Sequence, residues 1–305
     1  MADRPRSKLA AAMAAGREQG RRLTPGRPIT DHVPTGGLAD AELSLAEVEQ
    51  AVAGGAPLWR REWAVTVARA AERAGRTAGD DALVARAVAL QDALHEQDER
   101  EIGPIRESLR AQGFPADAFR AVLDACPTHE RDPLVRRLLR VDRVPERVTD
   151  KPAGMVHYVA SPLDAVLEIC RWVGPDDVFC DVGSGLGLVT MLVALITGAE
   201  ARGVEYDPAY HAWAEARAAE LGIPRLRYVQ GDARYADYTG VTVLYFYDTF
   251  RGTLLEELFV RLQPLAEAGP LRIISRGHSN PVLEAVPWLE VVSRGVAELL
   301  VMEAR

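Results

Sequence analysis

The sequence of 305 residues predicts two parts of different fold class: an all-α domain over residues 1–150 and an α/β domain over residues 151–305. In the first part, apolar residues recur at helical spacing, and no run of alternating apolar and polar residues indicates a strand. In the second part, short apolar runs alternate with helical patterns. This alternation is typical of a doubly wound, mostly parallel sheet with right-handed crossovers.

The helices of the first part are predicted from caps, breakers and apolar stripes. Ser44 and Glu47 have the spacing of a capping box, which would begin a helix, and Gly54-Gly55 would end that helix. Residues 24–37, rich in Pro, Gly and Thr, are expected to be a loop after a first helix. Further helices are expected around Trp59, Trp63 and Val67, around Leu83, Ala87, Leu90 and Leu94, and over residues 104–112, 115–125 and 133–140.

The α/β part is expected to begin with a helix at Ser161-Pro162, because serine is a good N-cap and proline suits the first turn. Strands are expected over residues 178–182, 201–205, 226–230, 241–247, 271–275, 288–292 and 297–303. Intervening helices are expected over residues 186–197, 208–221 and 254–262. The last two strands have no helix between them, which predicts an antiparallel edge.

Composition argues against several classes of partner. The formal net charge is −8, whereas proteins that bind nucleic acid usually carry a basic surface, so no nucleic-acid partner is expected. No apolar stretch reaches the length of a membrane span. Three widely spaced cysteines and the lack of a secretory signal predict a cytoplasmic protein. The cysteines and six histidines do not gather at ligand spacing, so no metal site is expected.

A glycine-rich turn follows the first predicted strand, where ligands bind in open α/β sheets. It reads Asp181-Val-Gly183-Ser-Gly185-Leu-Gly187, so its spacing is G-x-G-x-G rather than the G-x-G-x-x-G of dinucleotide sites. A carboxylate at Asp181 would repel a pyrophosphate, but it suits a cationic ligand such as a methionyl ammonium. The turn therefore favours S-adenosylmethionine over a nicotinamide dinucleotide.

Acidic residues also follow the next two predicted strands. Glu205 stands about 20 residues beyond the glycine turn, a position that suits hydrogen bonds to ribose hydroxyls. Tyr206 could flank the adenine, and Asp232 could accept a hydrogen bond from the adenine amino group. The alternative is that Asp207 and Asp232 only cap turns.

These segments resemble class I S-adenosylmethionine-dependent methyltransferases, in particular the Dot1-like branch and its bacterial relatives. The resemblance covers residues 151–280 and implies a Rossmann-like sheet of seven strands with S-adenosylmethionine as cofactor. The matching segments are Tyr158-Val-Ala-Ser-Pro162, residues 181–187, Gly203-Val-Glu205, Gly231-Asp232 and Tyr247-Asp-Thr-Phe250. It implies that the methionine and ribose contact Asp181, Gly183, Ser184, Gly185 and Gly187, that Glu205 holds the ribose, and that Asp232 and Ala233 hold the adenine.

Catalytic groups must face the methyl group, so they are expected in the segment before the first helix and after the fourth strand of the α/β part. Asp248 could take a proton from an acceptor and contact the cofactor, or it could only form a turn. Tyr158 and Tyr247 could place ring faces or hydroxyls near the sulfonium, although both could be core residues. His157 could act as a base near neutral pH, or it could be a surface residue.

Three functions are compatible with this pattern. The first is methylation of a small molecule at nitrogen or oxygen in specialised metabolism, which the acidic balance favours over a chromatin substrate. The second is cyclisation of S-adenosylmethionine itself to azetidine-2-carboxylate, with release of methylthioadenosine. The third is a non-catalytic module that senses the cofactor and binds a protein. The apolar faces around Trp59, Trp63 and Leu90 could form a lid, a homodimer contact or only a bundle core.

Overall fold

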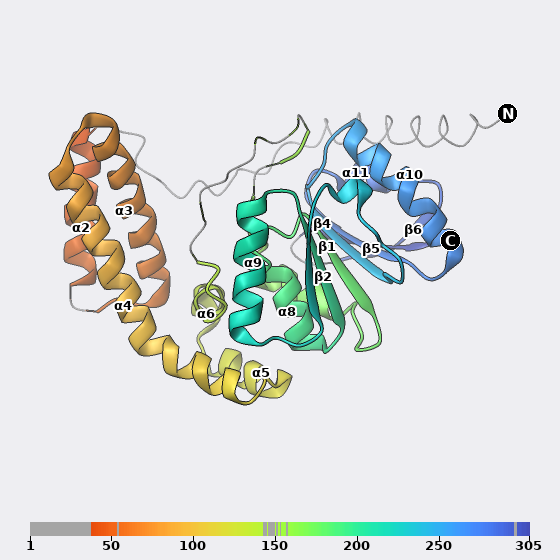
Figure 1. Ribbon diagram of the computed structural model, residues 1–305, viewed down its shortest axis with the longest axis horizontal. Helices are drawn as coiled ribbons and strands as arrows, with labels where there is room; N and C mark the ends of the chain where they lie inside the picture. Colours follow the sequence, from red (N-terminus) through yellow and green to blue (C-terminus); the bar gives the residue numbers. More distant parts are fainter. Residues whose placement is uncertain are drawn as a thin grey trace. The chain divides into compact units, whose positions relative to one another are not determined.

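The structure, a computed structural model, describes residues 38–305 apart from 54, 143–144, 146–149, 151, 153, 157 and 296–297. These residues form two units (Figure 1). Residues 38–111 and 122–138 belong to a helical unit, and residues 112–121 and 139–305 belong to a unit built on a sheet. The helix and loop expected before residue 38 lie outside the described residues. The domain boundary expected at residue 150 stays a prediction.

Apolar stripes hold the helices of the first unit together. The predicted stripe of Leu83, Ala87, Leu90 and Leu94 is confirmed: all four side chains are buried, and they share a core with Leu45. The helices are α2 (Leu38–Val52), α3 (Leu58–Ala78), α4 (Asp81–Ala111), α5 (Ala116–Ala125) and α6 (Arg131–Leu138), and a 3-10 turn, η1 (Thr128–Glu130), precedes α6. The residues of α5 are divided between the two units at residue 121.

Two helix boundaries predicted in this unit are wrong. The capping box at Ser44 does not begin a helix, because α2 already runs from Leu38 and its buried stripe starts at Ala41. Pro104 does not begin one either, since it lies inside α4. Proline removes one backbone hydrogen bond there, but Pro104 is on the exposed side of the helix, where water can replace that bond.

Trp59 and Trp63 do not pack in the core of the helical unit; they are 45% and 40% exposed. A step of four residues overshoots a helical turn by about 40°, so a row of residues spaced by four drifts around the helix. Val67 therefore faces inward, whereas Trp59, two such steps earlier, faces away.

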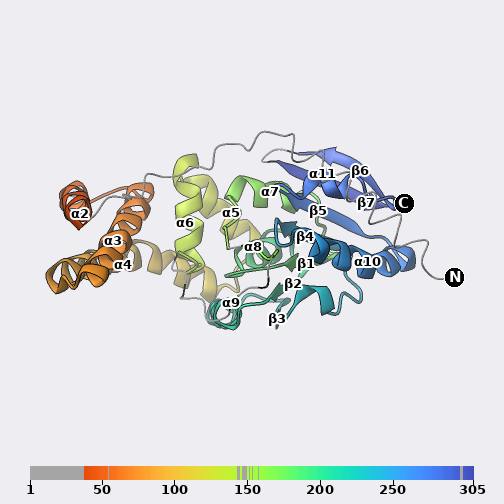
Figure 2. The same ribbon diagram turned by 90° about the horizontal axis from the view of Figure 1, so that it is seen from above.

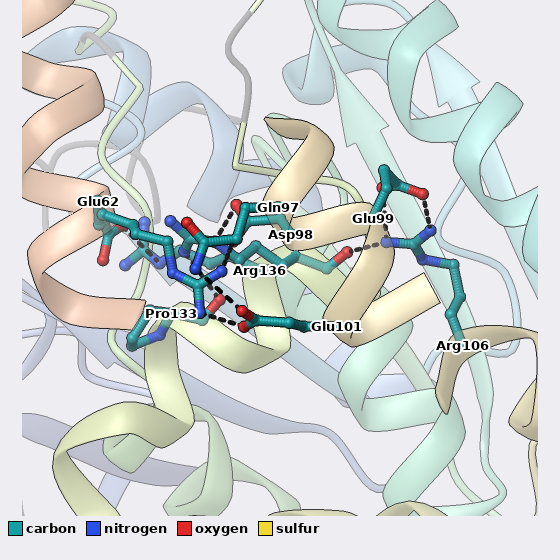
Figure 3. A network of polar contacts seen from close by, with 10 residues as sticks. Glu62, Gln97, Asp98, Glu99, Glu101, Arg106, Pro133 and Arg136 are labelled. Carbon is teal, nitrogen blue, oxygen red and sulfur yellow. Dashed lines mark hydrogen bonds and ion pairs between the residues drawn. The ribbon is translucent and has the colours of Figure 1, made fainter. Parts of the chain in front are cut away.

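A buried network of charges joins α3, α4 and α6 (Figure 3). Asp98 accepts hydrogen bonds from Arg61 Nη1 at 2.7 Å and from Arg137 Nε at 2.6 Å. Arg61 also pairs with Glu101, and Arg106 Nη1 donates to Glu99 at 2.8 Å. Because Arg61, Asp98 and Arg137 are almost completely buried, each charge depends on these partners.

The sheet of the second unit has seven strands in the order β3-β2-β1-β4-β5-β7-β6, with β7 antiparallel to both of its neighbours and the other pairings parallel. The predicted Rossmann-like sheet with an antiparallel edge is confirmed (Figures 1 and 2). Its strands are β1 (Val178–Val182), β2 (Glu200–Glu205), β3 (Leu226–Gln230), β4 (Val243–Tyr247), β5 (Arg272–Arg276), β6 (Leu289–Arg294) and β7 (Leu299–Ala304).

Helices cover both faces of this sheet (Figure 2). They are α7 (Leu163–Cys170), α8 (Leu188–Thr197), α9 (Pro208–Leu221), α10 (Thr253–Ala268) and α11 (Asn280–Leu283), with a 3-10 turn, η2 (Ala233–Tyr235), after β3. Phe246 of β4 packs edge-on against Phe259 of α10, and Phe250 is buried in the same core. The strand order reverses between β1 and β4, which places a ligand crevice at the carboxyl ends of these strands.

The expected N-cap at Ser161 is wrong. Helix α7 begins one residue later, its N-cap is Pro162, and no side chain caps it. The Ser161 hydroxyl is instead hydrogen-bonded to Tyr245 on β4. None of the described helices combines the length and apolar character that a membrane crossing needs.

Candidate active site

A cleft of about 800 Å³, open to solvent, lies at the carboxyl ends of β1, β2 and β4. Eight residues predicted to form the site line it: Tyr158, Asp181, Gly183, Ser184, Glu205, Tyr206, Ala233 and Tyr247. Four others, Gly185, Gly187, Asp232 and Asp248, are not among the lining residues. His157 lies outside the described residues.

The glycine turn after β1 is tied to the end of β2. The backbone N–H groups of Gly183 and Ser184 both donate to the carbonyl of Val204, at 2.8 and 3.0 Å. Glu205 completes the tie: its Oε2 accepts from Gly185 N–H at 2.8 Å, and its Oε1 accepts from Asp207 N–H at 2.8 Å. The buried Glu205 carboxylate is thus held at the edge of the cleft, and its remaining lone pairs can still accept hydrogen bonds.

The glycines of the turn are required by the packing of the protein itself. All three have positive φ, which favours glycine. A Cβ at Gly183 would lie 2.5 Å from Thr249 Cγ2, and one at Gly185 would collide with the ring of Tyr158. A Cβ at Gly187 would collide with Tyr228, whose hydroxyl donates to the Gly187 carbonyl. The side chains of Thr249, Tyr158 and Tyr228 therefore occupy the space that larger residues in the turn would need.

Two acidic side chains give the cleft its charge. Asp181 and Glu205 are both buried, and the described lining residues include no Lys, Arg or His. The pKa of Asp181 is raised to about 7, chiefly by burial; a hydrogen bond from Thr190 opposes this rise, and the nearby Glu205 carboxylate adds to it. A cation placed near Asp181 would therefore favour its ionised form.

Ser184 supplies a polar atom with no hydrogen-bond partner among the described residues. The residue lines the cleft, and its Oγ is buried. Leaving such a hydroxyl unsatisfied costs free energy, and a polar ligand in the cleft would recover it.

Tyrosines from three segments surround the cleft. Tyr158 packs edge-on against Tyr210 of α9, with ring centroids 5.7 Å apart. On β4, Tyr245 and Tyr247 point to the same face, since they are two residues apart in a strand. The buried Tyr245 hydroxyl lies 2.8 Å from Ser161 Oγ, and the Arg276 guanidinium lies 4.5 Å from the centre of the Tyr247 ring.

The segment before α7 forms one wall of the cleft and is bonded to the loop after β4. Met155 and Phe250 form an antiparallel bridge. Val156 N–H donates to the carbonyl of Thr249, and Arg251 N–H donates to the carbonyl of Gly154. These bonds hold the wall next to the residues that follow β4.

The Asp232 side chain is bound to Arg234. Both of its oxygens accept hydrogen bonds from the Arg234 guanidinium, and its Oδ1 also caps the 3-10 turn η2. These hydrogen bonds outweigh burial and hold the pKa of Asp232 below its ordinary value. Its neighbours Gly231 and Ala233 line the cleft instead. Asp232 thus caps a turn, as the alternative interpretation of the sequence expected. Its contact with the adenine stays a prediction.

Asp248 is likewise bound to neighbouring residues. One oxygen accepts from the backbone N–H of His278 and lies 2.9 Å from His278 Nδ1; the other accepts from Ser279 N–H and Oγ. Burial disfavours the charge, but these hydrogen bonds outweigh it and lower the pKa of Asp248. A direct catalytic contact by Asp248 stays a prediction, and the structure gives it the geometry of a residue that organises a loop.

Sequence reasoning missed the pair of Ser161 and Tyr245. Ser161 was assigned to a helix cap, and Tyr245 was counted only as part of a strand. Alternation would have indicated Tyr245, because it shares a strand face with Tyr247. Lining residues for which the sequence analysis gave no role, although some lie in the matching segments, are Met155, Val156, Val159, Ala160, Leu188, Val189, Val204, Tyr210, Gly231, Thr249 and Phe250.

Comparisons with known proteins found similar solved structures only. No model of a protein family matches the chain, and no curated protein matches it. The similar solved structures include several named as methyltransferases. One is an RNA methyltransferase from Salinibacter ruber in complex with S-adenosyl-L-homocysteine, at 24% identity over 48% of this chain and 92% of that one, with a TM-score of 0.37.

Two further solved structures belong to the same class. Magnesium protoporphyrin IX methyltransferase from Synechocystis PCC 6803, with bound S-adenosylmethionine, is 15% identical over 46% of this chain and 77% of that one, with a TM-score of 0.37. A putative caffeoyl-CoA O-methyltransferase from Staphylococcus aureus is 13% identical over 56% of this chain and 90% of that one, with a TM-score of 0.40. Likenesses at this level decide neither reaction nor substrate.

Proposed function

We propose that this protein binds S-adenosylmethionine in the cleft and transfers its methyl group to a nitrogen or oxygen of a small molecule in specialised biosynthetic metabolism. The observation that carries the proposal is the charge of the cleft: Asp181 and Glu205 line it, and its described lining has no basic side chain. S-adenosylmethionine carries a sulfonium and an ammonium, which such a cleft attracts, whereas it repels a pyrophosphate. The motif resemblance to the Dot1-like branch supports the same cofactor.

The residues of the cleft fit this cofactor. The Ser184 hydroxyl has no partner in the part of the chain that the structure describes, and the Glu205 carboxylate has lone pairs left for ribose hydroxyls. Tyr206, after β2, and Ala233, at the start of η2, line the part of the cleft where the adenine is expected. When bound, S-adenosylmethionine would supply an electrophilic methyl group on a sulfonium.

The contribution of the protein to methyl transfer would be orientation. The rings of Tyr158, Tyr245 and Tyr247 line the cleft and can attract a sulfonium through their faces. Asp181, near the end of β1 and two residues before Gly183, would hold the ammonium.

A second reaction, cyclisation of S-adenosylmethionine to azetidine-2-carboxylate, has one observation in its favour. The α-amino group must lose a proton before it can attack its own side chain. Burial raises the pKa of Asp181 to about 7, which suits a general base at neutral pH. This reaction would release methylthioadenosine and would need no acceptor.

The experiment that separates these reactions uses the purified chain with S-adenosylmethionine alone. Binding is measured by calorimetry, and nucleoside products are identified by mass spectrometry. Binding without turnover, followed by S-adenosylhomocysteine once small-molecule acceptors are added, would support methyl transfer. Methylthioadenosine formed without an acceptor would establish cyclisation instead. Binding with no product under either condition would indicate a sensing module, and no binding would overturn the proposal.

A further inference from the structure

The loop after β5 presents a histidine whose orientation is set by a buried carboxylate. His278 Nδ1 lies 2.9 Å from an Asp248 oxygen, the Asp248 residue is only 6% exposed, and the His278 side chain is 73% exposed. An ionised carboxylate can only accept hydrogen bonds, so Nδ1 carries the proton. In the neutral ring, Nε2 then keeps its lone pair, and that nitrogen is free to act as a base.

The backbone is shaped to make this contact. Asp248 has φ of 45°, a left-handed conformation that few residues other than glycine, asparagine and aspartate adopt. Gly277 has φ of 98°, and a Cβ there would lie 2.5 Å from the Asp248 carboxylate, so glycine leaves room for this side chain. Together these two conformations bring the carboxylate against His278.

The pair also lies beside the cleft. Tyr247 and Thr249, the two neighbours of Asp248 in the chain, line it. Tyr247 is paired in register with Arg276 on β5, two residues before His278, and the Arg276 guanidinium stacks on the Tyr247 ring. The loop that carries His278 thus starts at the carboxyl end of the strand next to β4, at the same edge of the sheet as the cleft, although neither His278 nor Asp248 is among the described lining residues.

We propose that His278, oriented by Asp248, is the general base that takes the proton of a hydroxyl acceptor, so that the substrate class is a phenol or alcohol. This inference rests on the proposed methyl transfer. His278 Nε2 takes the hydroxyl proton while the acceptor oxygen bonds to the methyl carbon, and the electron pair of the broken carbon–sulfur bond stays on sulfur. The imidazolium then releases its proton to water, which balances the step.

Charged groups lie on the strands next to His278. Asp248 faces it from the end of β4, and Arg276 precedes it on β5. On the far side of the loop, Asn280 Nδ2 donates to the backbone carbonyl of Glu298. The negative Asp248 would stabilise the imidazolium that forms when His278 takes the proton.

A first test follows the histidine itself and needs no turnover. The signals of the His278 ring nitrogens are assigned by their loss in His278→Gln, and nuclear magnetic resonance then identifies the protonated nitrogen in the unmodified protein and in Asp248→Asn. We expect the proton on Nδ1 in the neutral ring of the unmodified protein and a larger share of the Nε2 tautomer in Asp248→Asn. An unchanged tautomer in Asp248→Asn would overturn the pairing.

A second test uses S-adenosylmethionine with catechol, caffeate and 4-nitrophenol as acceptors. General-base catalysis typically contributes 100-fold or more, so His278→Gln should lower kcat about 100-fold while its dissociation constant for S-adenosylmethionine stays within about twofold. Added imidazole should restore part of the activity of His278→Ala.

Controls keep the outcomes distinct. His129, another exposed histidine near a carboxylate, should be replaceable by Gln without effect. A kcat of His278→Gln within threefold of the unmodified protein would overturn the role of His278. Methylation of amines such as benzylamine but of none of the phenols, or of neither class, would overturn the hydroxyl class. Failure to bind S-adenosylmethionine would instead overturn the proposed function itself.

Discussion

Glu205 accepts a hydrogen bond from the backbone N–H of Gly185 across 2.8 Å, and this bond joins the end of β2 to the glycine turn after β1. One carboxylate therefore shapes the turn and also faces the cleft. Its position explains why a single acidic residue can serve both the local structure and the binding of a ligand.

Replacement of Glu205 by Gln should weaken binding of S-adenosylmethionine. The amide keeps the size of the side chain but loses the charge, and hydrogen bonds to charged groups contribute about 1.5–3 kcal/mol. We expect the dissociation constant from calorimetry to rise about 10- to 100-fold. Glu215→Gln on α9, where the side chain is 66% exposed, is the control and should bind normally. Equal affinity of both variants would contradict a role for Glu205 in the site.

Gly185→Ala should destabilise the protein more than Gly198→Ala. Both glycines have positive φ, which costs alanine about 1–2 kcal/mol. A Cβ at Gly198 meets open space, whereas one at Gly185 collides with the Tyr158 ring. The unfolding temperature of Gly185→Ala should therefore fall further, and adding Tyr158→Ala should recover part of the loss. Equal decreases in the unfolding temperature of the two single variants would show that the contact between Gly185 and Tyr158 is unimportant.

The pH dependence of stability should report on Asp181. Burial raises its pKa in the folded protein from an ordinary value of 3.8 to about 7. The folded state therefore holds this proton more tightly, and the stability associated with it is present below about pH 4 and is lost as the pH rises to about 7. Asp181→Asn removes this dependence, so its unfolding temperature relative to the unmodified protein should increase between pH 5 and pH 8. A constant difference would contradict the raised pKa.

Asp98→Ala should unfold the helical unit more easily. It leaves two buried arginines, Arg61 and Arg137, without their shared partner, and loss of one member of a buried ion pair costs about 3–5 kcal/mol. Glu96→Ala on the same helix breaks an exposed pair with Arg100 and should cost about 0.5 kcal/mol or less. Urea unfolding followed by circular dichroism measures both, and similar losses would mean that the buried network contributes little.

The strands of the sheet could be predicted because their signals are local. The predicted ranges 178–182 and 226–230 equal β1 and β3, and the helix predicted over 208–221 equals α9 with its stop at Gly222. The expected helix starts at Ser44 and Ser161 were wrong for different reasons. Ser44 lies within an apolar stripe that begins earlier, and the Ser161 hydroxyl binds Tyr245, a residue 84 positions away.

Local pattern was enough to place Asp181, Glu205, Asp232 and Asp248 at or just beyond the ends of strands, because strand length and the turns that follow are set by neighbouring residues. It could not decide which of these carboxylates faces the cleft. Asp232 is bound to Arg234, and Asp248 to residues that follow a different strand, whereas Asp181 and Glu205 line the cleft. The direction of a buried charged side chain depends on the partners that compensate its desolvation, and for Asp248 those partners come together only when the sheet is assembled.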